Sequence, residues 1–420
     1  MANVSSSKVN AIVWDVVVIG GGPAGMTAAI EAATRGKSVV LLEKNSGLGK
    51  KLLITGGGRC NVTNNKPVVR EMLSQYKEAG KFLFSTFMQY GVTETIEFFN
   101  KRGLPFIEEN EGRLFPITEK AESVYGVLYN DLRHHNVLIK TESAVTGIIK
   151  HKEQFIITVK GGEEIRARKV VLATGGTARP ETGSTGDAWP WLTVLGHTIH
   201  AATTTLVPVT AREDWVKTLG GVSLPEAKIA IYCDGKKKLS AQGKLLFTHV
   251  GLSGPLILNQ SKVIGDLLVE GEVVVKIDLA TQFDASIIQA ELLSAFQNNP
   301  NKKIKNVLGE LIQTALVAPL LSVLNLEAEA VIHSVSAVDR KRIGVLVKAL
   351  PVTITGLLGT DKAVATAGGV DLAEVDFKTM ESKIVPGLYL VGDVLDINRP
   401  SGGYGLQLCW STGAVAGKSV

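Results

Sequence analysis

The sequence has few cysteines and little net charge, and each of these features excludes classes of protein. Its three cysteines, Cys60, Cys233 and Cys409, lie far apart in 420 residues, so they form neither a disulfide framework nor a Cys-x-x-Cys redox or metal-binding pair. The 45 basic and 40 acidic residues leave a net charge of only +5, which makes no strong electrostatic case for nucleic acid. We therefore expect a protein of a reducing, cytoplasmic environment.

Long apolar runs are also missing. The first residues, MANVSSSKVNAIVW, lack the basic segment, apolar stretch and cleavage site of a secretory signal. The stretch that comes closest to a membrane span, Leu311 to Leu326, is interrupted by Gln313, Pro319 and Ser322, and it is shorter than a bilayer requires. We expect no membrane association.

Glycine, in contrast, is abundant, with 44 residues. Such enrichment is typical of tight turns around phosphates or cofactors. The composition is otherwise that of a soluble globular protein, with 45% apolar and 20% charged residues. The length allows two or three domains, each with its own core. A multi-domain enzyme is the natural expectation.

The first sixty residues contain a glycine-rich turn between two strand-like segments. The stretch WDVVVIGGGPAGMTAAIEAATRGKSVVLLEKN holds an apolar run, the turn, a helical pattern from Pro23 to about Thr34, and a second apolar run. In the turn, Gly20 permits the bend, Gly22 lets the backbone approach a pyrophosphate, and Gly25 lets the helix pack closely on the strand. The pattern predicts the strand–turn–helix–strand unit of a dinucleotide-binding domain.

An acidic residue ends the second predicted strand. Glu43 follows Gly20 by 23 residues, which is where a carboxylate accepts hydrogen bonds from the adenosine ribose hydroxyls. This fingerprint by itself does not distinguish FAD from NAD, so the choice of cofactor depends on the rest of the chain.

Three further segments bear on the cofactor. Residues 137–176 alternate apolar and polar side chains in short runs, which predicts a small antiparallel meander that leads into the sequence ATGG. Near the C-terminus, GLYLVGDVLD predicts a strand that ends at Gly392 and Asp393. In PSGGYGLQLCWSTGAVAG, a glycine loop from Gly402 to Gly405 precedes a helical stretch.

These segments resemble a bacterial family of FAD-dependent flavoproteins, the aminoacetone oxidase-like or bile-acid reductase-like NAD(P)/FAD-dependent oxidoreductases. The resemblance runs in order through nearly the whole chain and is carried by DVVVIGGGPAG, EK, GKKLLITGGGRCNVTN, LATGG, GSTGD, LGH, LLFTHVGLSGP, TAGGV and LYLVGDVLD…GGYGLQ. The chain departs from the family at Asp393 and Gly405, where Glu and Asn are more usual. The motifs specify the family and its cofactor far better than its substrate.

The resemblance implies an α/β protein with a glutathione-reductase-like Rossmann FAD domain and an inserted β-barrel-like domain that itself carries a helical insertion. The sequence agrees, because AKIAIYC, GKLLFTH and GEVVVKIDL have strand patterns and residues 284–337 have helical periodicity. The expected parts are an FAD domain at 1–195 and 359–420, a β-barrel-like insertion at 196–280, a helical insertion at 281–345 and a return strand of the barrel at 346–358.

The resemblance also implies that TGGGRCN runs beside the ribityl chain and ring of FAD, with its glycines letting peptide N–H groups approach. Arg59 is then expected to hold a phosphate or to stabilise an anionic substrate or reduced flavin, and Asn61 to hydrogen-bond the cofactor. Cys60 is either a buried structural thiol or a reactive one. Asp393 would bind the ribityl hydroxyls, and the amides of 403–405 would face the pyrimidine edge, where the positive helix end favours reduced, anionic flavin.

The expected cofactor-binding residues come from both ends of the chain and from the meander. They are Gly20, Gly22, Pro23, Ala24, Gly25, Glu43, Lys44, Lys51, Gly57, Gly58, Arg59, Cys60, Asn61, Val145, Ala173, Thr174, Gly175, Gly176, Gly392, Asp393, Gly402, Gly403, Tyr404, Gly405 and Leu406.

The catalytic candidates are His249, Arg59 and Tyr404. His249 in FTHVGLSGP would exchange protons with substrate near neutral pH, although a histidine that only stabilises a turn fits the same pattern. Tyr404 would approach the ring through its side chain or its backbone. His197 and His200 are three residues apart, but no cysteine or carboxylate cluster joins them, so we expect no metal site.

The chain has neither a second nucleotide fingerprint nor a redox cysteine pair, which disfavours a disulfide reductase. We expect an FAD-dependent oxidoreductase that acts on a small amine or an unsaturated carbonyl compound through hydride transfer at the flavin. Its electrons would go to oxygen or come from transiently bound NAD(P)H. One alternative is a flavin-dependent RNA-modifying enzyme, in which NKKIK (301–305) and DRKR (339–342) touch phosphates. Another is a non-catalytic flavin-binding protein.

Overall fold

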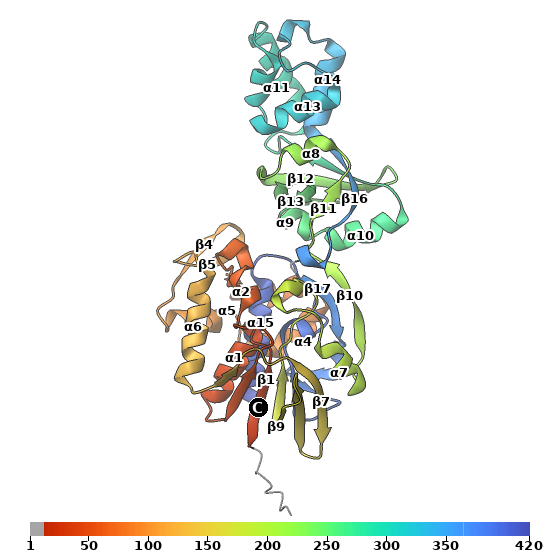
Figure 1. Cartoon of the computed structure of the whole chain (residues 1–420). Helices are drawn as coiled ribbons and strands as arrows, with labels where there is room; N and C mark the ends of the chain where they lie inside the picture. The colour runs from red at the N-terminus through yellow and green to blue at the C-terminus, as the bar shows by residue number, and fades with distance from the viewer. Residues whose placement is uncertain (1–11, 364) are drawn as a thin grey trace, which may run out of the picture. The chain divides into compact units, whose positions relative to one another are not determined.

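The computed structural model describes residues 12–363 and 365–420. The chain divides into two compact units, one comprising Thr205–Ala363 and the other the described residues on either side (Figure 1). The sequence placed these two boundaries at 195/196 and 358/359. The observed boundaries are later because β10 (Ile199–Thr205) pairs with β17 (Ala365–Val370) in a separate two-stranded sheet.

A nine-stranded sheet forms the core of the first unit. Strands β20, β9, β1, β2 and β6 are parallel neighbours in that order. The apolar run of β1 is fully buried, as is usual for a central strand of a parallel sheet covered on both faces. The strands are β1 (Val13–Ile19), β2 (Val39–Leu42), β6 (Leu138–Lys140), β7 (Val145–His151), β8 (Gln154–Val159), β9 (Glu164–Leu172), β18 (Val375–Asp376), β19 (Glu381–Ser382) and β20 (Leu388–Leu390).

The meander predicted before ATGG is confirmed, since β7, β8 and β9 are antiparallel neighbours and β9 continues as a parallel partner of β1. A small antiparallel sheet stands apart from the main one and contains β3 (Thr63–Asn64), β4 (Phe106–Glu109) and β5 (Arg113–Pro116). This small sheet fixes the segment that follows the triple glycine.

Helices from both ends of the chain cover the main sheet. In Figure 1, α1 near the N-terminus and α15 at the C-terminus lie in the same unit, and the two helices are in contact. The helices of this unit are α1 (Pro23–Ala33), α2 (Lys50–Leu53), α3 (Val69–Leu73), α4 (Gly80–Gln89), α5 (Val92–Asn100), α6 (Ala121–His134), α7 (Ala188–Val194) and α15 (Tyr404–Ser419), with short 3₁₀ helices η1 (Thr55–Gly58), η8 (Leu372–Glu374) and η9 (Gly392–Val394) among the connections.

The second unit contains a closed antiparallel barrel with the strand order β11, β14, β13, β12, β15, β16. Side chains alternate along β12, where Ile229 and Ile231 are buried inside and Lys228 and Tyr232 face outward. The strands are β11 (Val209–Ala211), β12 (Ser223–Cys233), β13 (Lys236–Phe247), β14 (Gly251–Ser253), β15 (Val273–Asp278) and β16 (Leu350–Leu357).

Helices occupy the connections of the barrel, and most of them lie between β15 and β16. These are α11 (Ala285–Asn298), α12 (Ile304–Gly309), α13 (Val317–Leu324) and α14 (Ala337–Lys348), while α8 (Asp214–Thr218), α9 (Pro255–Leu258) and α10 (Ser261–Glu270) lie earlier in the chain. In Figure 1, α11, α13 and α14 form one cluster. The expected fold class, a Rossmann domain with an inserted barrel that carries helices, is confirmed.

Candidate cofactor-binding and active site

Loops that are far apart in sequence meet at one edge of the main sheet. Ile19 of β1 is paired with Leu42 of β2 and with Leu172 of β9, and Leu172 is also paired with Leu390 of β20. The four strands are parallel and therefore end together, and in open parallel sheets ligands bind outside this carboxyl edge. These strand ends are followed directly by the expected cofactor segments, which are the fingerprint turn, Glu43, ATGG and Gly392–Asp393.

The three fingerprint glycines have different surroundings. A Cβ on Gly20 would lie 2.4 Å from the Ala173 carbonyl oxygen, and one on Gly25 would lie 1.9 Å from the Gly20 oxygen. A Cβ on Gly22 would meet no described atom within 4 Å. The first and third glycines are thus required by packing within the protein, whereas the second faces open space.

The amino end of α1 is free to bind an anion. The helix begins at Pro23, and its N-cap residue, Gly22, makes no side-chain hydrogen bond that would cap it. The first amide N–H groups of a helix have no partner within the helix, and with the helix dipole they attract phosphate. Gly22, the residue before this end, leaves room for such a group.

Glu43 is fixed beside the same turn. It is buried, and its Oε2 accepts a hydrogen bond from Gly21 N at 2.8 Å. Its Oε1 accepts from the backbone N and the Nδ2 of Asn45 at 2.8 and 2.7 Å. An ionised carboxylate offers about four acceptor positions, so these three bonds hold Glu43 in place and leave an acceptor for a ribose hydroxyl.

The triple glycine adopts a left-handed turn in η1. Gly56, Gly57 and Gly58 have φ angles of 57°, 69° and 86°, which residues other than glycine rarely adopt. A Cβ on Gly57 or Gly58 would meet no described atom within 4 Å. Gly57 and Gly58 are therefore required by backbone conformation and not by a protein neighbour, and they border open space, whereas a Cβ on Gly56 would also lie 3.0 Å from Asn61 N.

Asn61 joins the triple-glycine segment to the loop before α15. With its amide oriented to satisfy its neighbours, Asn61 accepts a hydrogen bond from Gly403 N at 3.0 Å and donates to the Thr63 carbonyl at 2.9 Å. Gly403 itself packs so tightly that a Cβ would lie 2.4 Å from the carbonyl carbon of Thr63. The two glycine-rich loops thus form one continuous backbone surface.

The structure favours the structural interpretation of Cys60. The side chain is fully buried, and this burial raises the pKa of its thiol to about 12, only partly offset by a hydrogen bond with Thr55. Nucleophilic cysteines react as thiolates, and a thiol with this pKa remains protonated near neutral pH.

Arg59 is not a free anion-binding group in this structure. Its Nη2 forms ion pairs with Glu109 Oε1 at 2.5 Å and with Glu119, and its guanidinium lies 4.2 Å from the centroid of the Phe115 ring. The hydrogen bond that Arg59 donates to Glu109 is the main cause that raises the pKa of Arg59. Two carboxylates therefore balance the positive charge of Arg59, which the sequence analysis expected to bind a phosphate, a substrate or the flavin.

Asp393 and Lys51, both expected from the sequence to bind the cofactor, lie together with a third residue, Arg399. Lys51 Nζ lies 3.4 Å from Asp393 Oδ2, and Arg399 forms an ion pair with Asp393 Oδ1. The side chain of Arg399 is only 4% exposed and that of Asp393 11%. Burial alone raises the pKa of the Asp393 carboxyl, but Arg399 and Lys51 outweigh it, so the pKa lies below its ordinary value.

The ATGG segment has a buried polar atom that the described residues leave unsatisfied. Thr174 Oγ1 has no hydrogen-bond partner there, and the same holds for Asn64 Oδ1 and Arg399 Nε. Buried polar groups in proteins are nearly always satisfied. Together with open glycine peptides and the uncapped helix end, these atoms fit a long ligand that carries a pyrophosphate and several donors and acceptors, as FAD does.

Other expected site residues already have partners within the first unit. Lys44 Nζ contacts Asp187 Oδ2 and Thr185 Oγ1, each at 2.6 Å. Val145 is half-buried at the start of β7.

Tyr404 is the first residue of α15 and is buried. Its carbonyl oxygen accepts a hydrogen bond from the Tyr76 hydroxyl at 2.8 Å. Burial raises the pKa of the Tyr404 phenol to about 12, so this group stays protonated at neutral pH. Leu406 in the same helical turn is buried.

His249 belongs to the second unit. It is exposed on the turn between β13 and β14, and its ring packs on Gly220, where a Cβ would come within 2.4 Å of the ring. Thr248 Oγ1 holds the turn by accepting a hydrogen bond from Gly251 N at 3.1 Å. The imidazole itself has no hydrogen bond to any described residue, so it is available to a ligand of this unit.

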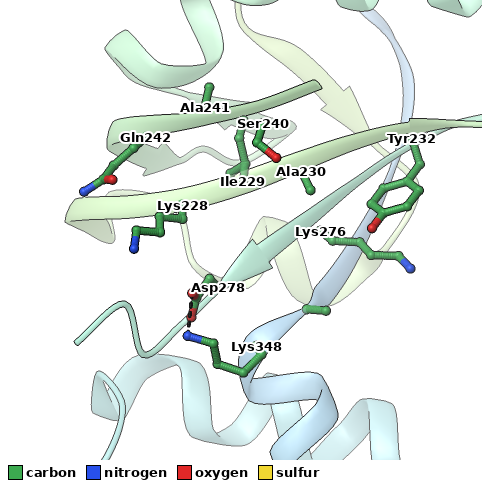
Figure 2. Close-up of a pocket in the computed structure, with 11 residues that line it drawn as sticks. Lys228, Ile229, Ala230, Tyr232, Ser240, Ala241, Gln242, Lys276, Asp278 and Lys348 are labelled. Atoms are coloured by element: carbon green, nitrogen blue, oxygen red, sulfur yellow. Dashed lines mark hydrogen bonds and ion pairs between the residues drawn. The ribbon is translucent and has the colours of Figure 1, made fainter. Parts of the chain in front are cut away.

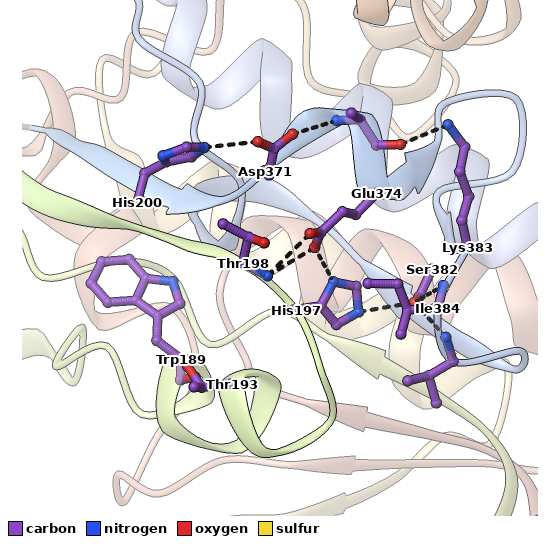
Figure 3. A network of polar contacts seen from close by, with 12 residues as sticks. Trp189, Thr193, His197, Thr198, His200, Asp371, Glu374, Ser382, Lys383 and Ile384 are labelled. Carbon is purple, nitrogen blue, oxygen red and sulfur yellow. Dashed lines mark hydrogen bonds and ion pairs between the residues drawn. The ribbon is translucent and has the colours of Figure 1, made fainter.

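His197 and His200 have separate carboxylate partners, as Figure 3 shows. His197 Nδ1 lies 2.8 Å from Glu374 Oε2 and its Nε2 lies 2.9 Å from Ser382 Oγ, while His200 Nε2 lies 3.0 Å from Asp371 Oδ2. The His197 side chain is fully buried. This network joins the start of β10 to the segment from η8 to β19. Among the described residues, no group of three His, Cys, Asp or Glu side chains is arranged to hold a metal ion.

The sequence as a whole matches one protein family. The HI0933-like protein Rossmann domain aligns with residues 14–419. The chain belongs to this HI0933-like family.

Curated relatives of the HI0933-like protein match it over nearly their whole length. The 3-dehydro-bile acid delta(4,6)-reductase of Clostridium scindens is 31% identical over 406 residues, which cover 96% of this chain and 98% of the relative. The ribosomal RNA dihydrouridine synthase of Haemophilus influenzae is 31% identical over 410 residues, with the same coverage of both chains.

A solved structure confirms the fold. The 3-ketosteroid-delta4-(5alpha)-dehydrogenase of Rhodococcus jostii aligns with a TM-score of 0.53 at 16% identity and covers 98% of this chain and 99% of its own. The HI0933-like protein is thus an enzyme, an FAD-dependent oxidoreductase, as the sequence motifs predicted. No helix of the described residues is long and apolar enough to cross a membrane.

Sequence reasoning missed Arg399 in the HI0933-like protein. Its signal was weak, an arginine six residues after Asp393 in a loop between two expected cofactor segments. Nothing local shows that this side chain turns back to Asp393.

Proposed function

We propose that the enzyme reduces a carbon–carbon double bond conjugated with a carbonyl group in a small molecule. The observation that carries this proposal is the full-length similarity to the bile-acid delta(4,6)-reductase. The dihydrouridine synthase of Haemophilus influenzae supports the same chemistry, since dihydrouridine is a uridine whose ring double bond, conjugated with a carbonyl group, has been saturated. These relatives favour the unsaturated carbonyl compound over the amine.

The expected cofactor-binding residues would hold FAD in this reaction, and FAD supplies a hydride when it is reduced. The α1 end and Gly22 would bind the pyrophosphate, Glu43 the ribose, and Asp393 the ribityl chain. The double bond gains a hydride at the carbon β to the carbonyl and a proton at the α carbon. We assign that proton to the Tyr404 phenol, which its raised pKa keeps protonated.

The electron donor in this proposal is NAD(P)H that visits the flavin transiently, because the chain carries a single dinucleotide fingerprint. We also propose a cytoplasmic location, since the three cysteines are free and a reducing compartment keeps thiols so.

Anaerobic stopped-flow spectroscopy of the bound flavin tests the proposal. NADH or NADPH should bleach the flavin, and an α,β-unsaturated ketone added second should restore its colour and yield the saturated ketone by mass spectrometry. The Tyr404→Phe variant should keep the first step and slow the second. Bleaching by an amine alone would instead identify an oxidase. A flavin that none of these compounds reduces would identify a non-catalytic flavin-binding protein.

A second candidate substrate is uridine in RNA, which the similarity to the dihydrouridine synthase of Haemophilus influenzae favours. Each lysine of NKKIK already has a carboxylate partner, since Lys302 pairs with Glu310 and both Lys303 and Lys305 pair with Glu329.

A hollow of about 440 Å³ on the outer face of the barrel is the better surface for RNA (Figure 2). Lys228 and Lys276 line it, and neither forms an ion pair with a described residue, whereas Lys348 pairs with Asp278 at 2.6 Å. The Lys276 amine lies 4.3 Å from the centroid of the Tyr232 ring. The hollow thus combines positive charge with an aromatic face.

Gel-shift measurements with ribosomal RNA transcripts at low salt separate the two substrate classes. Under the RNA alternative, Lys228→Gln with Lys276→Gln should weaken binding, and the control pair Lys303→Gln with Lys305→Gln should not. Absence of binding by the unchanged protein would remove this alternative and leave the small-molecule reductase.

A further inference from the structure

The ion-pair cluster of Lys51, Asp393 and Arg399 carries one more positive charge than negative. Asp393 lies in η9 at the carboxyl end of β20, Lys51 comes from α2, and Arg399 from the loop before α15. The cluster therefore ties together three segments that border the cofactor-binding edge of the sheet. A Cβ on Gly392 would lie 3.2 Å from the Cβ of Ala24, so η9 also touches the first helix.

Among the described residues, the side chains that act on Arg399 include no second anion. The other titratable side chains that act on Arg399 are Cys409 and Tyr76. Burial raises the pKa of the Cys409 thiol to about 12 and raises that of the Tyr76 phenol as well. Both groups are neutral near pH 7, so Asp393 is the anion among the described side chains that act on Arg399, and it faces two cations.

Arg399 also keeps a hydrogen-bond donor unused. Its Nη1 donates to the Ile397 carbonyl at 2.8 Å and its Nη2 to Asp393, but its buried Nε has no partner among the described residues. The Nε would lie 3.2 Å from a Cβ on Gly405, in the first turn of α15. The absence of a side chain at Gly405 thus leaves room for the guanidinium next to the positive end of this helix.

We propose that Arg399 and Lys51 keep Asp393 ionised and leave one uncompensated positive charge in the cofactor site, which stabilises the reduced, anionic form of the flavin. A hydride brings two electrons and one proton to the oxidised flavin and therefore makes its charge more negative by one. A fixed positive charge nearby favours the product of this step, and nearby charge is one of the means by which proteins tune flavins. Arg399 is a positioning residue in this proposal. The proposal rests on FAD binding and is independent of the substrate.

The test compares Arg399→Met with Arg399→Lys in the purified, FAD-loaded protein. The readouts are the flavin reduction potential, measured by dye equilibration, and the affinity for sulfite, which adds to flavins and leaves them with negative charge. Arg399→Met should lower the potential and weaken sulfite binding by about tenfold or more, as removal of a nearby charge implies. Arg399→Lys should restore most of both. Arg102→Met is the matched control, because it removes a surface pair with Asp131 in the same unit.

An Arg399→Met protein that binds FAD with unchanged potential and unchanged sulfite affinity would overturn the proposal. If this variant does not fold, Lys51→Met removes the same unit charge from a more exposed position, with a side chain 25% exposed. It should also lower the potential and the sulfite affinity, and unchanged values would overturn the proposal. No substrate is present, so a wrong assignment of the substrate does not affect the result.

Discussion

Gly413 of α15 lies directly against Ala24 of α1, so closely that a Cβ on Gly413 would be 2.4 Å from the Ala24 carbonyl oxygen. One turn later, a Cβ on Gly417 would be 2.4 Å from the Ala28 carbonyl oxygen. The two glycines allow the last helix of the chain to rest on the backbone of the first. Through this contact both chain ends build one cofactor site.

Replacement of Gly413 should therefore destabilise the whole first unit. Gly413→Ala forces the helices apart, and overpacking of this kind costs about 1–3 kcal/mol. Gly126→Ala is the matched control, because Gly126 lies inside α6 and a Cβ there would meet no described atom within 4 Å. It should stabilise the helix by roughly 0.5–1 kcal/mol. Urea unfolding of both variants measures the difference, and equal midpoints would contradict the close contact.

The fingerprint glycines should separate folding from cofactor binding. Gly25→Ala places a Cβ 1.9 Å from the Gly20 oxygen, so we expect a misfolded or strongly destabilised protein. Gly22→Ala meets open space at a φ of −78°, so we expect a normal fold with weaker FAD binding. Circular dichroism and FAD titration give the two readouts. Full FAD affinity in Gly22→Ala would show that the pyrophosphate does not approach this residue.

The Asp393 ion pairs should contribute stability that depends on acidity. The pKa of Asp393 is lowered from its ordinary value of 3.8, so the contribution is complete above that pH and is lost as the pH falls through the lower value in the folded protein. Removal of one partner from a buried pair costs about 3–5 kcal/mol, and we expect Asp393→Asn to lose this much at neutral pH.

Urea unfolding at a fixed excess of FAD, repeated at decreasing pH, tests this prediction. The difference between the unchanged protein and Asp393→Asn should be constant well above pH 3.8 and should shrink below it. A difference that does not change with pH would show that Asp393 is not ionised in the folded protein.

Cys60 should resist alkylation in the native protein. Its buried thiol has a pKa of about 12, and only the thiolate reacts at a useful rate. We expect iodoacetamide at neutral pH to leave Cys60 unmodified until the protein is unfolded, as peptide mass spectrometry would show. A Val269→Cys variant supplies an exposed control, because Val269 is 89% exposed. Rapid labelling of native Cys60 would restore the reactive interpretation.

The strand–turn–helix–strand unit was predicted from the sequence because its determinants are local, whereas the choice of FAD depended on motifs spread along nearly the whole chain. Gly20, Gly22 and Gly25 lie within six consecutive residues. Each is required by a close backbone neighbour or by a ligand that binds at this short turn. The strands and helices of the inserted unit were likewise predicted from patterns of alternation and helical periodicity. The boundaries between the units were not, because they depend on the pairing of β10 with β17 across a long insertion.

The sequence by itself determined a Rossmann dinucleotide-binding domain, since spacing along the chain fixes which backbone groups can meet a phosphate, and its motifs taken together resembled a family that binds FAD. Only the tertiary structure decided how the charged side chains are used. It paired Arg59 with Glu109 and Glu119, and it turned Arg399 back onto Asp393 beside Lys51. Such pairs join segments that are brought together only by the packing of helices and strands. The sequence around a charged residue on a loop does not indicate which residue it will pair with.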